Sequence, residues 1–91
     1  MAKKDVKVSF SGRTISVDQK TVQPQVNNDT VDWSGPKQYT IVLSGGKQIP
    51  ATQQGGQWLA SAGPWKSAQK IKYDVTAPDH DDLDPDIEVV P

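Results

Sequence analysis

Hydrophobic and polar residues alternate with a period of two along most of the chain. Successive side chains of an extended strand point to opposite faces, so this alternation predicts strands with one buried face. The apolar members of these stretches are Val6, Val8, Phe10, Ile15, Val17, Val31, Trp33, Tyr39, Ile41, Leu43, Ile71, Tyr73, Val75, Ile87 and Val89. No stretch longer than two turns shows the period of an amphipathic helix. We therefore expect an all-β protein.

Turn-forming residues separate the alternating stretches. Ser11-Gly12 predicts a first hairpin, and Asn27–Asp29 and Gly45-Gly46 predict further turns. Pro24 favours an edge position for its extended segment, because proline has no amide hydrogen to donate to a neighbouring strand.

The pattern is weakest between residues 52 and 69, and residues 47–51 give at most a short edge strand. A structureless connection of that length is uncommon in a compact domain, so we expect a short strand near Trp58. The sum is about seven short strands in one domain over residues 1–91, which predicts a Greek-key β-sandwich or a barrel.

Composition agrees with this fold class. Val, Ile and Thr outnumber Leu, Met and Ala by about two to one, and β-branched side chains favour strands over helices. The chain has no cysteine, which excludes disulfides, zinc–thiolate sites, iron–sulfur clusters and thiol nucleophiles. The first ten residues lack the apolar segment of a secretory signal, so we expect a cytoplasmic protein; an exported chain trimmed of its signal would look the same. No apolar run is long enough to cross a membrane.

Charge is distributed unevenly although the net charge is only −1. All ten Lys and Arg residues lie before residue 79, whereas residues 79–91 carry six carboxylates. The basic residues are scattered singly, and this disfavours nucleic-acid binding, which needs a concentrated basic face.

The segment "VQPQVNNDTVDWSGPKQYTIVL" joins a strand, a polar turn, a Val-x-Trp strand and another strand. With "NDTVDW" at Asn28–Trp33, "IKYDV" at Ile71–Val75 and "DPDIEVVP" at Asp84–Pro91, the chain resembles the cupredoxin family of plastocyanin-like Greek-key sandwiches. In that resemblance "NDTVDW" starts a strand, "IKYDV" is the penultimate strand and "DPDIEVVP" the last. Similar strand–turn–strand patterns with a tryptophan also occur in immunoglobulin-like sandwiches.

The resemblance implies a copper site whose ligands this chain lacks. Blue-copper centres use two histidines, a cysteine thiolate and usually a methionine. Gln38 and Tyr39 stand where the resemblance implies the first histidine, Val75 or a neighbour stands at the cysteine position, and the one methionine is Met1. We therefore expect no copper, no electron transfer and no other cofactor.

The acidic segment "DHDDLDPDIE" gives weak candidates for a Ca²⁺ site. Its candidate ligands are Asp79, Asp81, Asp82 and Asp84. The order of an EF-hand is absent, and Pro85 stiffens the loop. A solvated acidic face, attracted weakly to the basic body, is the alternative. His80 has no partner in the sequence that would make it a general base.

Trp58 and Trp65 lie in the least patterned region, beside Gly55-Gly56 and Gly63-Pro64. They are candidates for contact with a protein partner, for stacking on a sugar, or for filling a core that is poor in Leu and Ile. No pair of residues forms a nucleophile and base, so we expect no enzyme and no catalytic residue. The sequence therefore predicts a non-catalytic protein-binding or assembly module, with a Ca²⁺-binding domain and a carbohydrate-binding module as alternatives.

Overall fold

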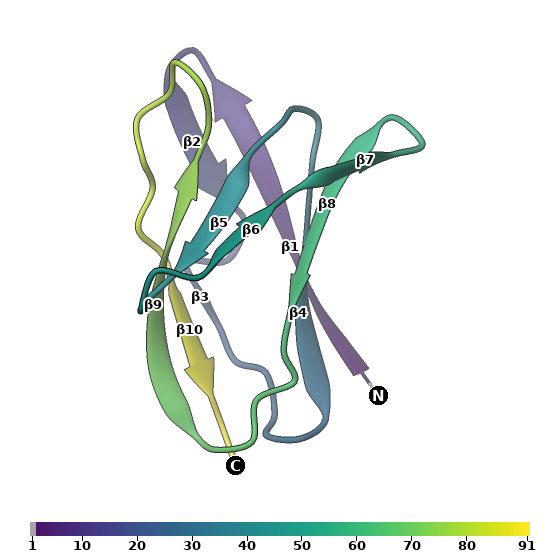
Figure 1. Ribbon diagram of the computed structural model, residues 1–91, viewed down its shortest axis with the longest axis vertical. Coiled ribbons are helices and arrows are strands. Elements are labelled where there is room, and N and C mark those ends of the chain that lie inside the picture. The colour runs from purple at the N-terminus through teal and green to yellow at the C-terminus, as the bar shows by residue number, and fades with distance from the viewer. Residues whose placement is uncertain (1) are drawn as a thin grey trace.

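The computed structural model describes residues 2–91, and these residues form strands and loops without any helix (Figure 1). The ten strands are β1 (Ala2–Ser11), β2 (Thr14–Val17), β3 (Thr21–Val22), β4 (Asp29–Gly35), β5 (Thr40–Leu43), β6 (Gln48–Pro50), β7 (Thr52–Gln54), β8 (Gln57–Ala62), β9 (Gln69–Thr76) and β10 (Asp86–Val89). Within this range, nothing forms a helix that could span a membrane. The prediction of an all-β chain is confirmed.

Two five-stranded sheets make up the sandwich. The first sheet has the order β2-β1-β4-β8-β7, and the second has the order β3-β10-β9-β5-β6. β1 runs parallel to β4, and β10 runs parallel to β3, whereas the other neighbours are antiparallel. The two parallel pairs bring together segments that are far apart in the chain.

Each side of the sandwich is bridged by a segment that passes from one sheet to the other. Residues 18–20 join β2 to β3, and Ala51 alone separates β6 from β7. Figure 1 shows β6 and β7 following one another as a single band across the molecule. The amide of Ala51 donates to the carbonyl oxygen of Tyr39 at 2.9 Å, which ties this crossing to the body.

The core lies between the inner faces of the two sheets, as the alternation predicted. Trp33 on β4 is 1% exposed, and its Nε1 donates to the hydroxyl of Tyr73 on β9 at 3.1 Å. Their rings meet edge to face with centroids 5.3 Å apart. Trp33 therefore joins the first sheet to the second. The sequence places this large side chain shortly after the Asn27–Asp29 turn, and in the structure it fills the space between the sheets. Phe10 and Val17, also predicted to face inward, are partly buried against this core.

The structure has ten strands where the sequence predicted about seven, and the difference lies in short pieces. β3, β6 and β7 have two or three residues each, so seven strands have four residues or more. The expected short strand near Trp58 is half of a hairpin, β7–β8, that turns at Gly55-Gly56. Both glycines have positive φ (57° and 83°), the backbone that a two-residue hairpin turn requires.

Candidate functional site

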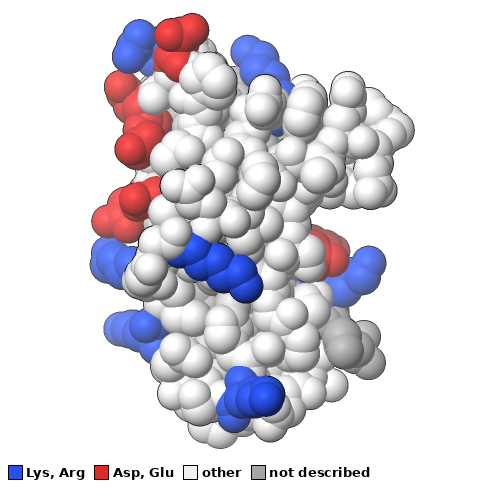
Figure 2. Space-filling view, viewed as in Figure 1, with Lys and Arg blue, Asp and Glu red and all other residues white. Residues whose placement is uncertain are grey.

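The outer face of the first sheet is hollowed between strands β1 and β4 and the β7–β8 hairpin. A cavity of about 480 Å³ lies there, and a second of about 250 Å³ adjoins it toward the hairpin turn. Ser34 and Gln57 line both, so the two cavities form one groove, here called the outer groove. Figure 2 shows the hairpin standing out from the body above this recess.

The strand alternation places the groove's side chains. Trp33 turns into the core, so its neighbours Asp32 and Ser34 point to the opposite face. The register then sets rows across the sheet: Asp32 is paired with Asp5 of β1 and with Ser61 of β8. One row further along, Ser34 is paired with Lys7 and Leu59, and Leu59 with Thr52.

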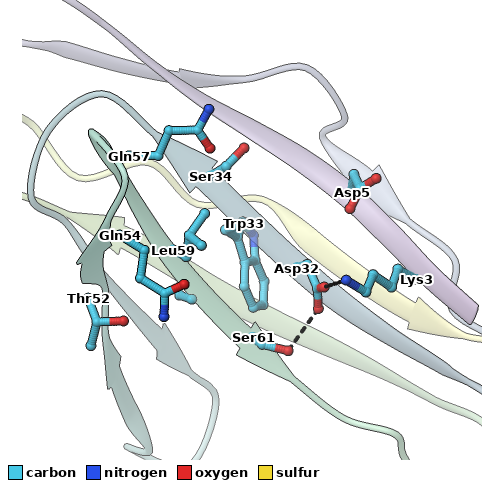
Figure 3. Close-up of a pocket in the computed structure, with 11 residues that line it drawn as sticks. Lys3, Asp5, Asp32, Trp33, Ser34, Thr52, Gln54, Gln57, Leu59 and Ser61 are labelled. Atoms are coloured by element: carbon cyan, nitrogen blue, oxygen red, sulfur yellow. Dashed lines mark hydrogen bonds and ion pairs between the residues drawn. The ribbon is translucent and has the colours of Figure 1, made fainter. Parts of the chain in front are cut away.

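Asp32 is the most constrained charged group of the groove (Figure 3). Its Oδ1 accepts hydrogen bonds from Ser61 Oγ at 2.8 Å and from Thr30 Oγ1 at 3.1 Å. Its Oδ2 lies 3.7 Å from Lys3 Nζ, in an ion pair whose lysine side chain is 71% exposed. Exposed pairs of this kind hold weakly, so Lys3 is free to move away while the hydroxyls keep Asp32 in place.

Neutral hydrogen-bonding groups make up the hairpin side of the groove. Thr52, Gln54 and Gln57 line that wall, and Leu59 lies among them, partly buried. Among the residues that the structure describes, no histidine or tyrosine lines either cavity. The arrangement suits hydrogen bonding to an extended polar ligand.

Trp58 and Trp65 lie at opposite ends of β8. Trp58 is paired with Gly35, and its carbonyl accepts a hydrogen bond from the Tyr39 hydroxyl at 2.9 Å. Trp65 follows the other end of the strand, where its carbonyl accepts from the amide of Asn27 at 2.8 Å. Both rings are partly buried against the core. Trp58 therefore lies beside the end of β4 at Gly35, and Trp65 beside the turn at Asn27.

The carboxylates near the C-terminus are distributed among basic side chains of the body. Asp81 pairs with Arg13 at 3.7 Å, and Lys72 pairs with Asp84 at 3.6 Å and with Asp86 at 3.4 Å. The hydrogen bond with Asp86 and the charges of Asp84 and Asp86 raise the pKa of Lys72. Figure 2 shows acidic side chains spread along the left edge of the molecule in that view. Over residues 2–91, no three potential metal ligands converge on one point.

This distribution agrees with the expected attraction of the acidic segment to the basic body. Asp79, another of the candidate ligands, is exposed in a left-handed backbone conformation (φ 60°), and Asp82 is exposed as well.

His80 packs on Phe10 at the end of the sandwich. Its ring meets the Phe10 ring edge to face with centroids 5.1 Å apart, and its Nδ1 lies 2.6 Å from the carbonyl oxygen of Pro78. Its Nε2 is buried and has no hydrogen-bond partner in the described chain. Within residues 2–91 no carboxylate hydrogen-bonds to this histidine, so its contacts are those of a packed side chain.

Comparison with protein-family models finds no family that matches this chain, and comparison with curated proteins finds no similar sequence.

The outer groove was not predicted from the sequence. The available signal was the set of outward positions beside Trp33, but which outward residues become neighbours depends on strand order.

Proposed function

We propose that this chain is a non-catalytic protein-binding module that holds an extended segment of its partner in the outer groove. The observation that carries this proposal is the groove itself, a recess of about 480 Å³ that continues into a second cavity along the sheet. Sites for small molecules usually enclose the ligand within mainly apolar walls. An open, polar-lined groove suits a stretch of polypeptide better.

The geometry of a β-sheet favours an extended occupant. Side chains on one face of a strand repeat every two residues, and an extended peptide lying along the groove has the same spacing. β7 forms one wall and is also the free edge of the first sheet, with all three of its residues exposed. An exposed edge offers backbone groups to an added strand, a common mode of peptide recognition.

A metal-free, cupredoxin-like Greek key is part of the same proposal. It is supported by the order of the strands: β4 begins at Asp29 within "NDTVDW", and β9 and β10 are the last two strands of the chain. Tyr39 and Val75, which stand at the implied ligand positions, are buried at 1% and 0% exposure and belong to the core. Valine has no donor atom, and the Tyr39 hydroxyl is engaged with the Trp58 carbonyl.

A selection from displayed linear peptides tests the proposed function. Peptides enriched on the wild-type chain would be measured against Ser34→Gln, which fills the groove where its two cavities join. Thr40→Gln is the matched control, because Thr40 lies on the outer face of the second sheet and is also partly buried. We expect Ser34→Gln to weaken binding about tenfold or more, corresponding to about 1.4 kcal/mol, and Thr40→Gln to leave it unchanged.

Two other results would contradict the proposal. Equal binding to both variants would place the peptide outside the groove. Loss of binding in Trp58→Ala alone would move the site to Trp58, one of the two tryptophans that the sequence suggests for a partner contact.

A further inference from the structure

Two like charges occupy paired positions in the outer groove. Asp5 of β1 and Asp32 of β4 are Cα partners in the parallel register, and both side chains line the larger cavity. Like charges directly opposite one another on neighbouring strands repel and cost stability. Within residues 3–91, the Asp5 side chain makes no hydrogen bond and no ion pair, so only Lys3 offsets the repulsion by its contact with Asp32.

On the second sheet, by contrast, charged residues at paired positions have opposite signs. On its outer face, Lys72 is the register partner of Asp86, and Lys70 is the partner of Glu88. Both pairs form ion pairs, at 3.4 Å and 4.0 Å. The chain thus pairs opposite charges on the outer face of the second sheet and places two carboxylates at paired positions in the outer groove.

Building on the proposed function, we infer that the segment held in the groove presents a lysine or arginine side chain to Asp5 and Asp32. Asp32 is held in place by Ser61 and Thr30, so it is oriented before the ligand arrives. Among residues 3–91, its Oδ2 contacts the exposed side chain of Lys3 alone. A guanidinium carries five donors in a planar fork and can bond to both carboxylates at once, which makes arginine the better fit.

Lys7 limits where this cation can bind. It belongs to the next row of the sheet, two residues along β1 from Asp5, and lines the second cavity. A second basic residue two positions along an extended partner would face Lys7 and be repelled. The groove therefore suits a single basic side chain among neutral ones, rather than a polybasic segment.

Three synthetic peptides of equal length test this inference: acetylated, amidated Thr-Gln-X-Gln-Thr with X as arginine, citrulline or glutamate. Citrulline keeps the shape of arginine and removes its charge. Each would be titrated into the ¹⁵N-labelled chain to about 5 mM while the amide signals of β1, β4 and β8 are followed. We expect the arginine peptide to bind about two- to fivefold more tightly than the citrulline peptide, since exposed ion pairs contribute modestly.

The variants Asp5→Asn and Asp32→Asn should abolish that preference, and Asp82→Asn, an exposed carboxylate outside the groove, should keep it. Unchanged amide spectra elsewhere would show that the variants are folded. Equal binding of all three peptides in the groove would overturn the inference while leaving the proposed function in place. An absence of groove shifts with every peptide would also overturn it, and the peptide selection with Ser34→Gln would then judge the proposed function independently.

Discussion

On the outer face of the second sheet, Lys72 lies opposite Asp86 and Lys70 opposite Glu88, whereas on the outer face of the first sheet Asp5 lies opposite Asp32. The two faces cover one core and show the same outward alternation, but their paired charges differ in sign. A ladder of opposite charges stabilises its own sheet slightly and leaves little field for a ligand. A like-charged pair costs a little stability and leaves a field that a cation can satisfy. Charge pairing across strands therefore separates a structural face from a candidate binding face.

The largest expected change in stability concerns the core that both sheets share. Trp33→Ala should lower the free energy of unfolding by about 3–5 kcal/mol, because it leaves a cavity between the sheets and deprives Tyr73 of its hydrogen-bond donor. Ser34→Gln, the next residue on the same strand, should change the free energy of unfolding by less than about 1 kcal/mol, because its side chain lies in the groove. Urea unfolding followed by circular dichroism measures both values. Similar losses for the two variants would mean that the groove is structurally coupled to the core, and the faces could not then be compared as independent surfaces.

The second test uses the hydroxyls that join the sheets. Burial raises the pKa of Tyr39 and Tyr73 above the usual value of 10.0, although the hydrogen bond from Trp33 partly opposes this for Tyr73. A tyrosine that stays protonated in the folded state but ionises in the unfolded state contributes stability that is present below pH 10 and is lost as the pH rises above it. We expect unchanged stability up to about pH 9.5, then a loss of up to about 1.4 kcal/mol per pH unit for each tyrosine.

The double variant Tyr39→Phe/Tyr73→Phe provides the control for this pH dependence. It should be less stable at neutral pH, because the hydrogen bonds to Trp58 and from Trp33 are lost. Its stability should nevertheless fall less steeply above pH 10. An equally steep fall in the variant would assign the alkaline loss to groups other than these tyrosines, such as Lys72, whose pKa is also raised.

The smallest expected effect tests the comparison most directly. Asp86→Asn removes one partner of an opposite-charge pair and should lower the free energy of unfolding by about 0.5 kcal/mol. Asp5→Asn removes one of two like charges and should raise it by a similar amount, about 0.5 kcal/mol. Both changes should shrink between about 0.02 M and about 1 M salt, because added ions screen exposed charges. If both variants changed the free energy of unfolding in the same direction at low salt, the two faces would not differ in how their paired charges affect stability.

Much of the local structure was predictable from the sequence. The first hairpin, the edge position of the segment with Pro24, the inward face of Tyr39, Ile41 and Leu43, and the buried Trp33 are all present in the structure. The β7–β8 hairpin was only partly predicted. Its outward residues are neutral and include the apolar Leu59, and its inward residues include the small Ala60 and Ala62, so the alternation between apolar and polar positions was faint.

The candidate site was not predictable in the same way. Trp58 and Trp65 are close in sequence, yet the intervening strand carries them to opposite ends of the sandwich. Asp5 and Asp32 are far apart in sequence, yet the parallel pairing of β1 with β4 makes them neighbours.

The alternation of apolar and polar residues by itself determined that this chain forms strands and which side chains face the core. The reason is that successive side chains of a strand point to opposite faces of the sheet. Composition and turn residues added the all-β class and most of the reversals. Strand order, register and the position of the β7–β8 hairpin beside the groove were decided only in the tertiary structure. They depend on how segments distant in the sequence pack around a common core. The groove and its paired carboxylates belong to that second group, since no local pattern states which outward residues will meet.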